Sequence, residues 1–215
     1  MTPAQSAALA DQADRAAIRD LLENWVVWRD SGDWNRLETL WHDGGRIVTT
    51  WSNSSYEDFI AASRKVFDQH GAVALHLLGG SSINLGESRA VAHSKMQIIM
   101  RGVLEGLEVI STCTGRFVDA LEKRNGRWGI VLRQPVYELD RLDLVDPSAS
   151  LKLDANLLAS FPSAYRHLGY LQTKMGLKVN PRLPTTTGPE MDALRNRMES
   201  WLAGNSLSCL DQACP

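Results

Sequence analysis

A histidine in an apolar run is the first residue of this chain whose type and setting could support chemistry. His76 lies within residues 73–78, whose other members are all apolar. An unperturbed histidine side chain has a pKa of ~6.5, so its neutral imidazole can act as a general base, which raises a reaction rate by roughly 10²–10⁴-fold. A histidine in such a run is also a common core residue with satisfied ring nitrogens, so the pattern alone leaves both interpretations open.

Two charged residues could complete an acid–base set with His76. Asp30 lies at the margin of an apolar helical stripe, at the C-terminal end, where the helix dipole does not favour a carboxylate and a cationic partner is needed. Arg133 lies on a predicted half-buried strand, where its guanidinium could orient an oxyanion or neutralise Asp30. The alternatives are a solvated turn residue for Asp30 and an exposed strand arginine for Arg133.

Aromatic residues concentrate in the first third of the chain. Five of the seven tryptophans fall between residues 25 and 51, which predicts a core of large side chains, an aromatic-lined cavity for a flat ligand, or both. Further polar candidates are tyrosines, whose hydroxyl groups could donate hydrogen bonds. A histidine and a lysine on one face of a predicted strand are also candidates, although they could equally lie at a surface or interface. The candidate substrate-binding residues are Tyr137, Trp51, Tyr56, Trp25, His93 and Lys95.

The composition argues against several function classes. The 215 residues carry 23 Lys+Arg against 25 Asp+Glu, so the chain lacks the basic excess of a nucleic-acid binder. No apolar run reaches the ~18 residues of a membrane span, and the N-terminus does not resemble a secretory signal, so we expect no membrane partner. The three cysteines predict neither a disulfide framework nor a zinc site, and indicate a reduced cytoplasmic chain. A bridge between Cys209 and Cys214 is a minor alternative.

The order of the predicted elements is helices first and long strands second. Apolar periodicity predicts helices over 14–31, 33–41 and 56–70, and a short strand over 47–51 after the break at Gly44-Gly45. Strands are predicted over 73–78, 90–101, 107–124 and 127–140, with Asn125-Gly126 as a two-residue hairpin turn. This pattern favours an α+β domain over 14–145 in which one curved antiparallel sheet holds the helices on its concave side. Residues 146–215 are predicted to form a C-terminal extension of helices (151–160, 165–175, 190–203) and a proline-rich loop.

Several of these motifs resemble a known superfamily in their order and spacing. The segment from Ile18 to Trp34, the run His76-Leu77-Leu78-Gly79-Gly80 with Ile83, and the hairpin 115–133 resemble the SnoaL-type (polyketide-cyclase-like) branch of the nuclear-transport-factor-2-like superfamily. Gly80 replaces the asparagine that is usual in that branch. The resemblance implies a cone-shaped α+β barrel with an internal cavity. It also implies an oligomer, which we predict to be a homotrimer because the outer face of an open sheet must be covered.

The resemblance gives the candidate residues their roles. It places His76 as general base, Asp30 as its partner and Arg133 as a pocket arginine. The superfamily contains several activities, so the activity of this chain must be inferred from the residues of its site. No nucleotide motif, metal cluster or nucleophile with a neighbouring base is recognisable, and we therefore expect a lyase that needs neither cofactor nor metal and acts on a small hydroxylated aromatic substrate.

Residues 137–143 and 165–168 are similar to a subgroup related to diarylpropane lyases, which release formaldehyde from lignin-derived diols. The reaction could therefore be a dehydration or such a C–C cleavage. The alternatives are a non-catalytic ligand carrier or structural subunit, and an isomerase or hydrolase that uses the same residues.

Overall fold

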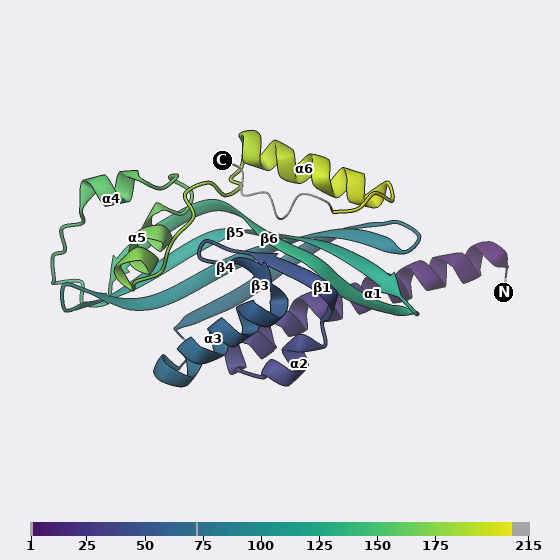
Figure 1. Ribbon diagram of the computed structural model, residues 1–215, viewed down its shortest axis with the longest axis horizontal. Helices are drawn as coiled ribbons and strands as arrows, with labels where there is room; N and C mark the ends of the chain where they lie inside the picture. The colour runs from purple at the N-terminus through teal and green to yellow at the C-terminus, as the bar shows by residue number, and fades with distance from the viewer. Residues whose placement is uncertain (1, 72, 208–215) are drawn as a thin grey trace.

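A six-stranded, strongly curved sheet forms the centre of the molecule, with helices on both of its faces (Figure 1). The computed structural model describes residues 2–71 and 73–207. Cys209 and Cys214 lie outside the described residues, whereas Cys113 is a buried free thiol. The predicted α+β class is confirmed.

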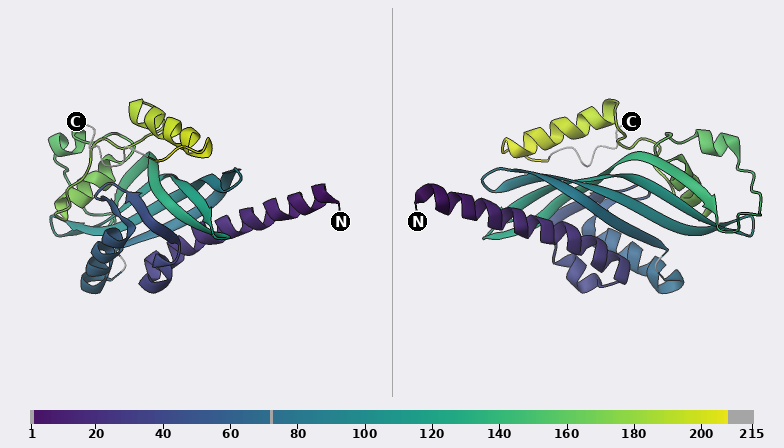
Figure 2. Two further views of the ribbon diagram at one scale, coloured as in Figure 1. Left: turned by 45° about the vertical axis from the view of Figure 1, so that its right-hand side comes forward. Right: turned by 180° about the vertical axis from the view of Figure 1, so that it is seen from behind.

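Three helices precede the long strands and pack on one face of the sheet (Figure 1). They are α1 (Pro3–Ser31), α2 (Trp34–Glu38) and α3 (Tyr56–His70). Helix α1 begins earlier than predicted, and its first part, residues 3–13, projects beyond the sheet (Figure 2). This part is exposed and alanine-rich, so it is helical without the apolar stripe on which the prediction depended. The helix ends at Gly32, whose φ of 74° is the left-handed conformation that favours glycine.

The sheet has the order β2-β1-β6-β5-β4-β3, and it is open rather than closed into a barrel. Its strands are β1 (Trp41–Val48), β2 (Asn53–Ser55), β3 (Ala74–Leu85), β4 (Arg89–Leu104), β5 (Leu107–Arg124) and β6 (Arg127–Leu144). All described neighbours are antiparallel except β1 and β6, which are parallel. The expected curved, mainly antiparallel sheet is confirmed, and the parallel β1–β6 pair is the departure from it, because β1 reaches β6 from the helical layer and not through a hairpin.

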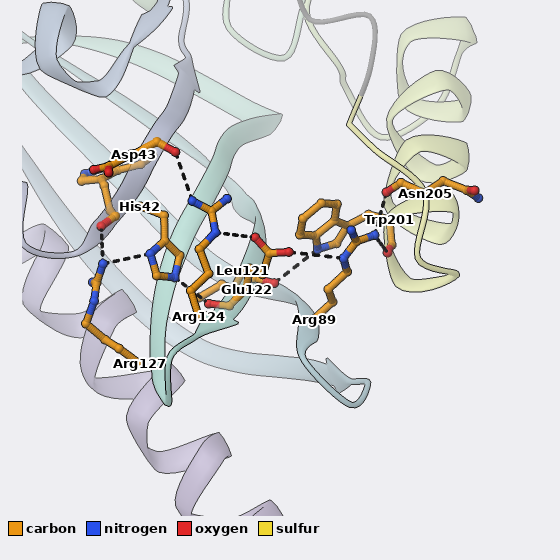
Figure 3. A network of polar contacts seen from close by, with 10 residues as sticks. His42, Asp43, Arg89, Leu121, Glu122, Arg124, Arg127, Trp201 and Asn205 are labelled. Atoms are coloured by element: carbon orange, nitrogen blue, oxygen red, sulfur yellow. Dashed lines mark hydrogen bonds and ion pairs between the residues drawn. The ribbon is translucent and has the colours of Figure 1, made fainter.

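Strand β1 begins before Gly44-Gly45 rather than after it, because these glycines lie where the pairing register with β6 shifts between Trp41 and Arg46. A polar network fixes this irregular segment (Figure 3). His42 Nε2 donates to the Glu122 carbonyl at 2.9 Å, while Arg127 donates to His42 Nδ1 at 2.9 Å. Burial lowers the pKa of His42, so the neutral ring can accept and donate at once.

The C-terminal extension folds onto both faces of the sheet. Its helices are α4 (Ala155–Ala159), α5 (Arg166–Lys174) and α6 (Pro189–Leu202). Helix α6 lies on the face opposite α1–α3 (Figures 1 and 2), where Arg89 stacks on the Trp201 ring at 3.9 Å and donates to the Trp201 and Asn205 carbonyls (Figure 3). Helix α5 packs against β4, β5 and β6, with Leu171 filling the space beside Gly102.

One buried carboxylate anchors α5 to β6. Asp140 accepts hydrogen bonds from the backbone N–H groups of His167 (2.6 Å) and Leu168 (2.9 Å) and from His167 Nδ1 (2.9 Å). Its side chain is fully buried, whereas the His167 side chain is 26% exposed. Asp140 therefore satisfies the free N–H groups at the start of α5 and holds the extension in place.

We predict that Asp140→Asn loosens the extension. An amide oxygen cannot accept all three hydrogen bonds as a carboxylate does, and an unsatisfied buried donor costs about 1–3 kcal/mol. Urea unfolding should show that loss, and limited proteolysis should cleave sooner between residues 146 and 164. Asp143→Asn is the matched control, because Asp143 is half exposed and its ion pair is with Arg141 at the surface. Equal stability of the two variants would contradict the anchoring role.

Candidate active site

A largely enclosed cavity of about 90 Å³ lies between the helical layer and the sheet. Its walls are mostly apolar, and aromatic rings from α1, the β1–β2 connection, α3 and β5 supply much of them. These rings are Trp25, Trp51, Phe59 and Phe117. Trp51 and Phe59 stack at 5.3 Å, and Trp25 meets Phe117 edge to face at 5.5 Å. The tryptophan-rich segment contributes to both the core and the cavity, because Trp34 and Trp41 are core residues while Trp25 and Trp51 line the cavity.

His76 and Asp30 meet at the wall of this cavity. His76 Nδ1 lies 2.8 Å from Asp30 Oδ1, and the His76 backbone N–H donates to Asp30 Oδ2 at 2.5 Å. Because an ionised carboxylate only accepts, Nδ1 carries the proton, and Nε2 makes no hydrogen bond within the described part of the chain. The ring meets Trp25 edge to face at 5.4 Å. The geometry therefore presents a neutral histidine whose orientation and tautomer are fixed by a carboxylate.

The electrostatic setting keeps His76 available as a proton acceptor. Burial is the main cause that lowers its pKa, the Asp30 carboxylate acts in the opposite direction, and the Arg29 and Arg133 guanidinium groups lower it further. Arg29 is also near Asp30, with 3.6 Å between Nη1 and Oδ1. Arg29 thus provides the cationic partner that the position of Asp30 demanded.

Arg133 lines the same cavity but does not neutralise Asp30. Its Nε and Nη2 donate to the two carboxylate oxygens of Asp119 at 2.7 and 3.0 Å, and both side chains are fully buried. The guanidinium carbon lies 4.4 Å from the Trp25 ring centre and 4.5 Å from that of Phe117. Burial raises the pKa of Asp119, and the Arg133 charge opposes that shift. The exposed-arginine alternative is wrong, and the pair places a balanced charge beside the cavity.

The other predicted contact residues divide between the cavity and the rest of the molecule. Tyr137 lines the cavity, where burial raises the pKa of its hydroxyl and Thr50 is its hydrogen-bond partner. Tyr56 does not reach the cavity; it stacks on Trp41 at 5.4 Å.

The structure does not bring His93 and Lys95 to the cavity. They lie on the outer face of β4, because side chains alternate along a strand and the cavity receives Ile98 and Met100 from the other face. Lys95 pairs there with Glu138 at 2.6 Å, and Arg116 also contacts Glu138.

Sequence reasoning missed several polar residues of the site, including Arg29. Asp119 lies in an otherwise apolar stretch of β5, a position that could have marked it as a buried charge partner. Ser63 of α3 and Gln172 of α5 also line the cavity. Nothing in the sequence indicates that a glutamine of the extension returns to the site, because only the packing of α5 places it there.

Among the described residues, no group of three or more His, Cys, Asp or Glu side chains could hold a metal ion. In the same part of the chain, no helix has the length and apolar character that a membrane crossing requires.

Residues 10–134 match the model of the SnoaL-like domain, which is more than half of the chain. The chain belongs to the SnoaL-like domain family. The match spans the elements that carry Asp30, His76, Asp119 and Arg133, whereas α5 and α6 of this SnoaL-like protein lie beyond it.

Fungal relatives match this SnoaL-like chain over nearly its whole length. It is 36% identical to "Pea pathogenicity protein 2" of Fusarium vanettenii over 205 residues, covering 90% of this chain and 88% of the relative. A PEP2-like protein of the same fungus is 34% identical with the same coverage. The extension is therefore part of what these relatives share.

A solved structure agrees with the fold. A hexachlorocyclohexane dehydrochlorinase superposes with a TM-score of 0.51 at 12% identity, over 67% of this chain and 97% of that one. At this identity the likeness concerns the fold alone.

We predict that Asp119→Asn destabilises the protein by about 3–5 kcal/mol, because it leaves the Arg133 charge buried without compensation. Urea unfolding with a constant m-value measures the loss. Glu138→Gln makes the same chemical change on the outer face, where both partners, Lys95 and Arg116, keep contact with solvent, and should cost below about 1 kcal/mol. Comparable losses in both variants would argue against a special role for the buried pair.

Proposed function

We propose that this SnoaL-like protein is a lyase that needs no cofactor and uses His76 as a general base on a small hydroxylated aromatic substrate. The observation that carries the proposal is the buried contact between His76 and Asp30 beside an aromatic-walled cavity. A histidine oriented by a carboxylate, with its second nitrogen free of hydrogen bonds to the described residues, is the arrangement that proton abstraction requires.

The leading reaction is a dehydration. His76 Nε2 removes a proton from the carbon next to a hydroxyl-bearing carbon, and the electrons of that C–H bond form the double bond as the C–O bond breaks. The imidazolium returns the proton to the departing hydroxide, which leaves as water. Asp30 stabilises the imidazolium between the two steps.

A formaldehyde-releasing C–C cleavage could use the same groups, with His76 taking the proton of a hydroxyl. The cavity volume of about 90 Å³ is below the roughly 150 Å³ of an apolar cavity that binds a single benzene, so an aromatic substrate requires the walls to move apart. A one-ring compound requires less widening than a two-ring diarylpropane diol, and we therefore favour dehydration of a one-ring compound.

Arg133 assists the departing or developing oxygen. Two of its guanidinium nitrogens are held by Asp119, and the third, Nη1, has no partner among the described residues. A donor fixed in this way costs no reorganisation during the reaction. Tyr137 is a weaker proton donor, because burial raises the pKa of its hydroxyl, so we assign it to the wall of the site.

A non-catalytic carrier is the second candidate. The apolar walls suit ligand binding as well as catalysis. The buried polar set argues against a pure carrier, because a hydrophobic ligand does not require the Asp30, Asp119 and Arg133 charges beside it, and burying charges is costly.

We predict that His76→Ala lowers kcat by about 10²-fold or more with a smaller effect on KM, because the base acts in the transition state. Asp30→Asn should also lower kcat, since an amide no longer stabilises the imidazolium. The assay is a panel of one-ring and two-ring aromatic diols and chlorinated rings, with product analysis and no added cofactor. His42→Ala is the control, because His42 is buried in the network of β1 and does not line the cavity.

The pH dependence provides a second readout of the same prediction. The pKa of His76 lies below its usual value of ~6.5, so the neutral base persists above that pH and is lost only at more acidic pH. We expect kcat/KM to be level near neutrality and to fall on the acid side. Normal turnover by His76→Ala would falsify the mechanism, and absence of turnover across the panel would favour the carrier.

We further propose that the chain forms a homotrimer through the part of the outer sheet face that α6 leaves open. Leu75, Leu77 and Leu139 are exposed there by 48%, 57% and 68%. Light scattering at micromolar concentration should give three chains, and Leu77→Glu with Leu139→Glu should lower the mass. Val27→Glu, an exposed change on α1, is the control. A monomeric wild type would contradict this proposal.

A further inference from the structure

Buried polar atoms without partners gather around the cavity. Five cavity-lining residues each hold such an atom, unpaired among the described residues: Trp25 Nε1, Arg29 Nε, Ser63 Oγ, Arg133 Nη1 and Gln172 Oε1. A buried polar group that lacks a hydrogen bond costs about 1–3 kcal/mol. Several of them around one apolar cavity are the mark of a ligand that carries its own polar groups.

Apart from the Ser63 hydroxyl, which can donate or accept, these atoms are either donors or acceptors. The indole and guanidinium N–H groups of Trp25, Arg29 and Arg133 can only donate, so they match a ligand oxygen that accepts. Gln172 Oε1 can only accept, so it matches a ligand hydroxyl that donates. A single hydroxyl has one proton and two lone pairs, so it cannot satisfy the three donors and Gln172 together, whereas two oxygen substituents can.

The position of Gln172 is fixed by the extension. Gln172 belongs to α5 and is 5% exposed, and the preceding Leu171 packs against Gly102 of β4. The Asp140 carboxylate holds the first turn of the same helix. The amide therefore sits on a rigid element rather than on a loop, which is the condition for discriminating between similar ligands.

We infer that Gln172 is a specificity-determining residue that accepts a hydrogen bond from a second hydroxyl of the substrate, and that the substrate is a one-ring compound with two oxygen substituents. The first oxygen accepts hydrogen bonds from the donors on the Arg133 side of the cavity, and the second, a hydroxyl, donates one to Gln172. This inference rests on the proposed function for the identity of the site, but it concerns recognition and not the proton transfer.

The test measures binding without turnover. Isothermal titration uses the three benzenediols, catechol, resorcinol and hydroquinone, each against the cresol in which a methyl group replaces one hydroxyl. A site that leaves a buried acceptor unpaired discriminates against the analogue without the hydroxyl. In the wild type we expect at least one diol to bind about 10-fold more tightly than its cresol, the equivalent of about 1.4 kcal/mol. Gln172→Met, similar in length and without the amide, should bring that ratio close to one.

The control is Gln97→Leu, which removes an amide from the outer face of β4 and should leave the ratio unchanged. If Gln172→Met does not fold by circular dichroism, Gln172→Leu replaces it, and the wild-type preference remains a test by itself. An unchanged ratio in the Gln172 variants, or a wild type that prefers no diol, overturns the inference. Diol preference that depends on Gln172 without turnover of any panel compound would instead reject only the lyase function.

Discussion

The carboxylate of Asp30 is the contact on which the site depends, because it joins α1 to the edge strand β3. It accepts both the backbone N–H and the Nδ1 proton of His76, so strand and imidazole are positioned by the same group. Removing its charge would loosen the helix–strand contact as well as change the histidine. Structure and proposed chemistry thus share one interaction, which is why the histidine can be buried and still have a defined tautomer.

The same arrangement occurs a second time in the molecule. Asp140 accepts the backbone N–H and Nδ1 of His167 at 2.6 and 2.9 Å, and it joins the extension to β6. The two pairs differ in what surrounds them. His76 faces an aromatic cavity, whereas His167 is partly exposed and does not line that cavity. Similar geometry therefore supports a catalytic proposal in one place and an anchoring role in the other.

Charge balance explains how an apolar cavity can hold so many ionisable side chains. Arg133 is matched by Asp119, and Arg29 lies beside Asp30, so opposite charges are paired within the low-dielectric interior. The extension completes the site with Gln172 on α5. The described part of the extension, residues 146–207, thus supplies a wall of the cavity through α5 and covers part of the sheet through α6.

The sequence by itself determined the α+β class, the order of the elements, the Asn125-Gly126 turn and the candidates Asp30, His76 and Arg133. Local patterns suffice for these, because periodicity, turn chemistry and family motifs act over a few residues. The tertiary structure alone decided that Arg133 pairs with Asp119, that His93 and Lys95 lie on the outer face, and that Gln172 reaches the cavity. The parallel β1–β6 pair was also decided there. These outcomes depend on strand register and on the docking of distant segments, where a shift of one residue moves a side chain to the opposite face.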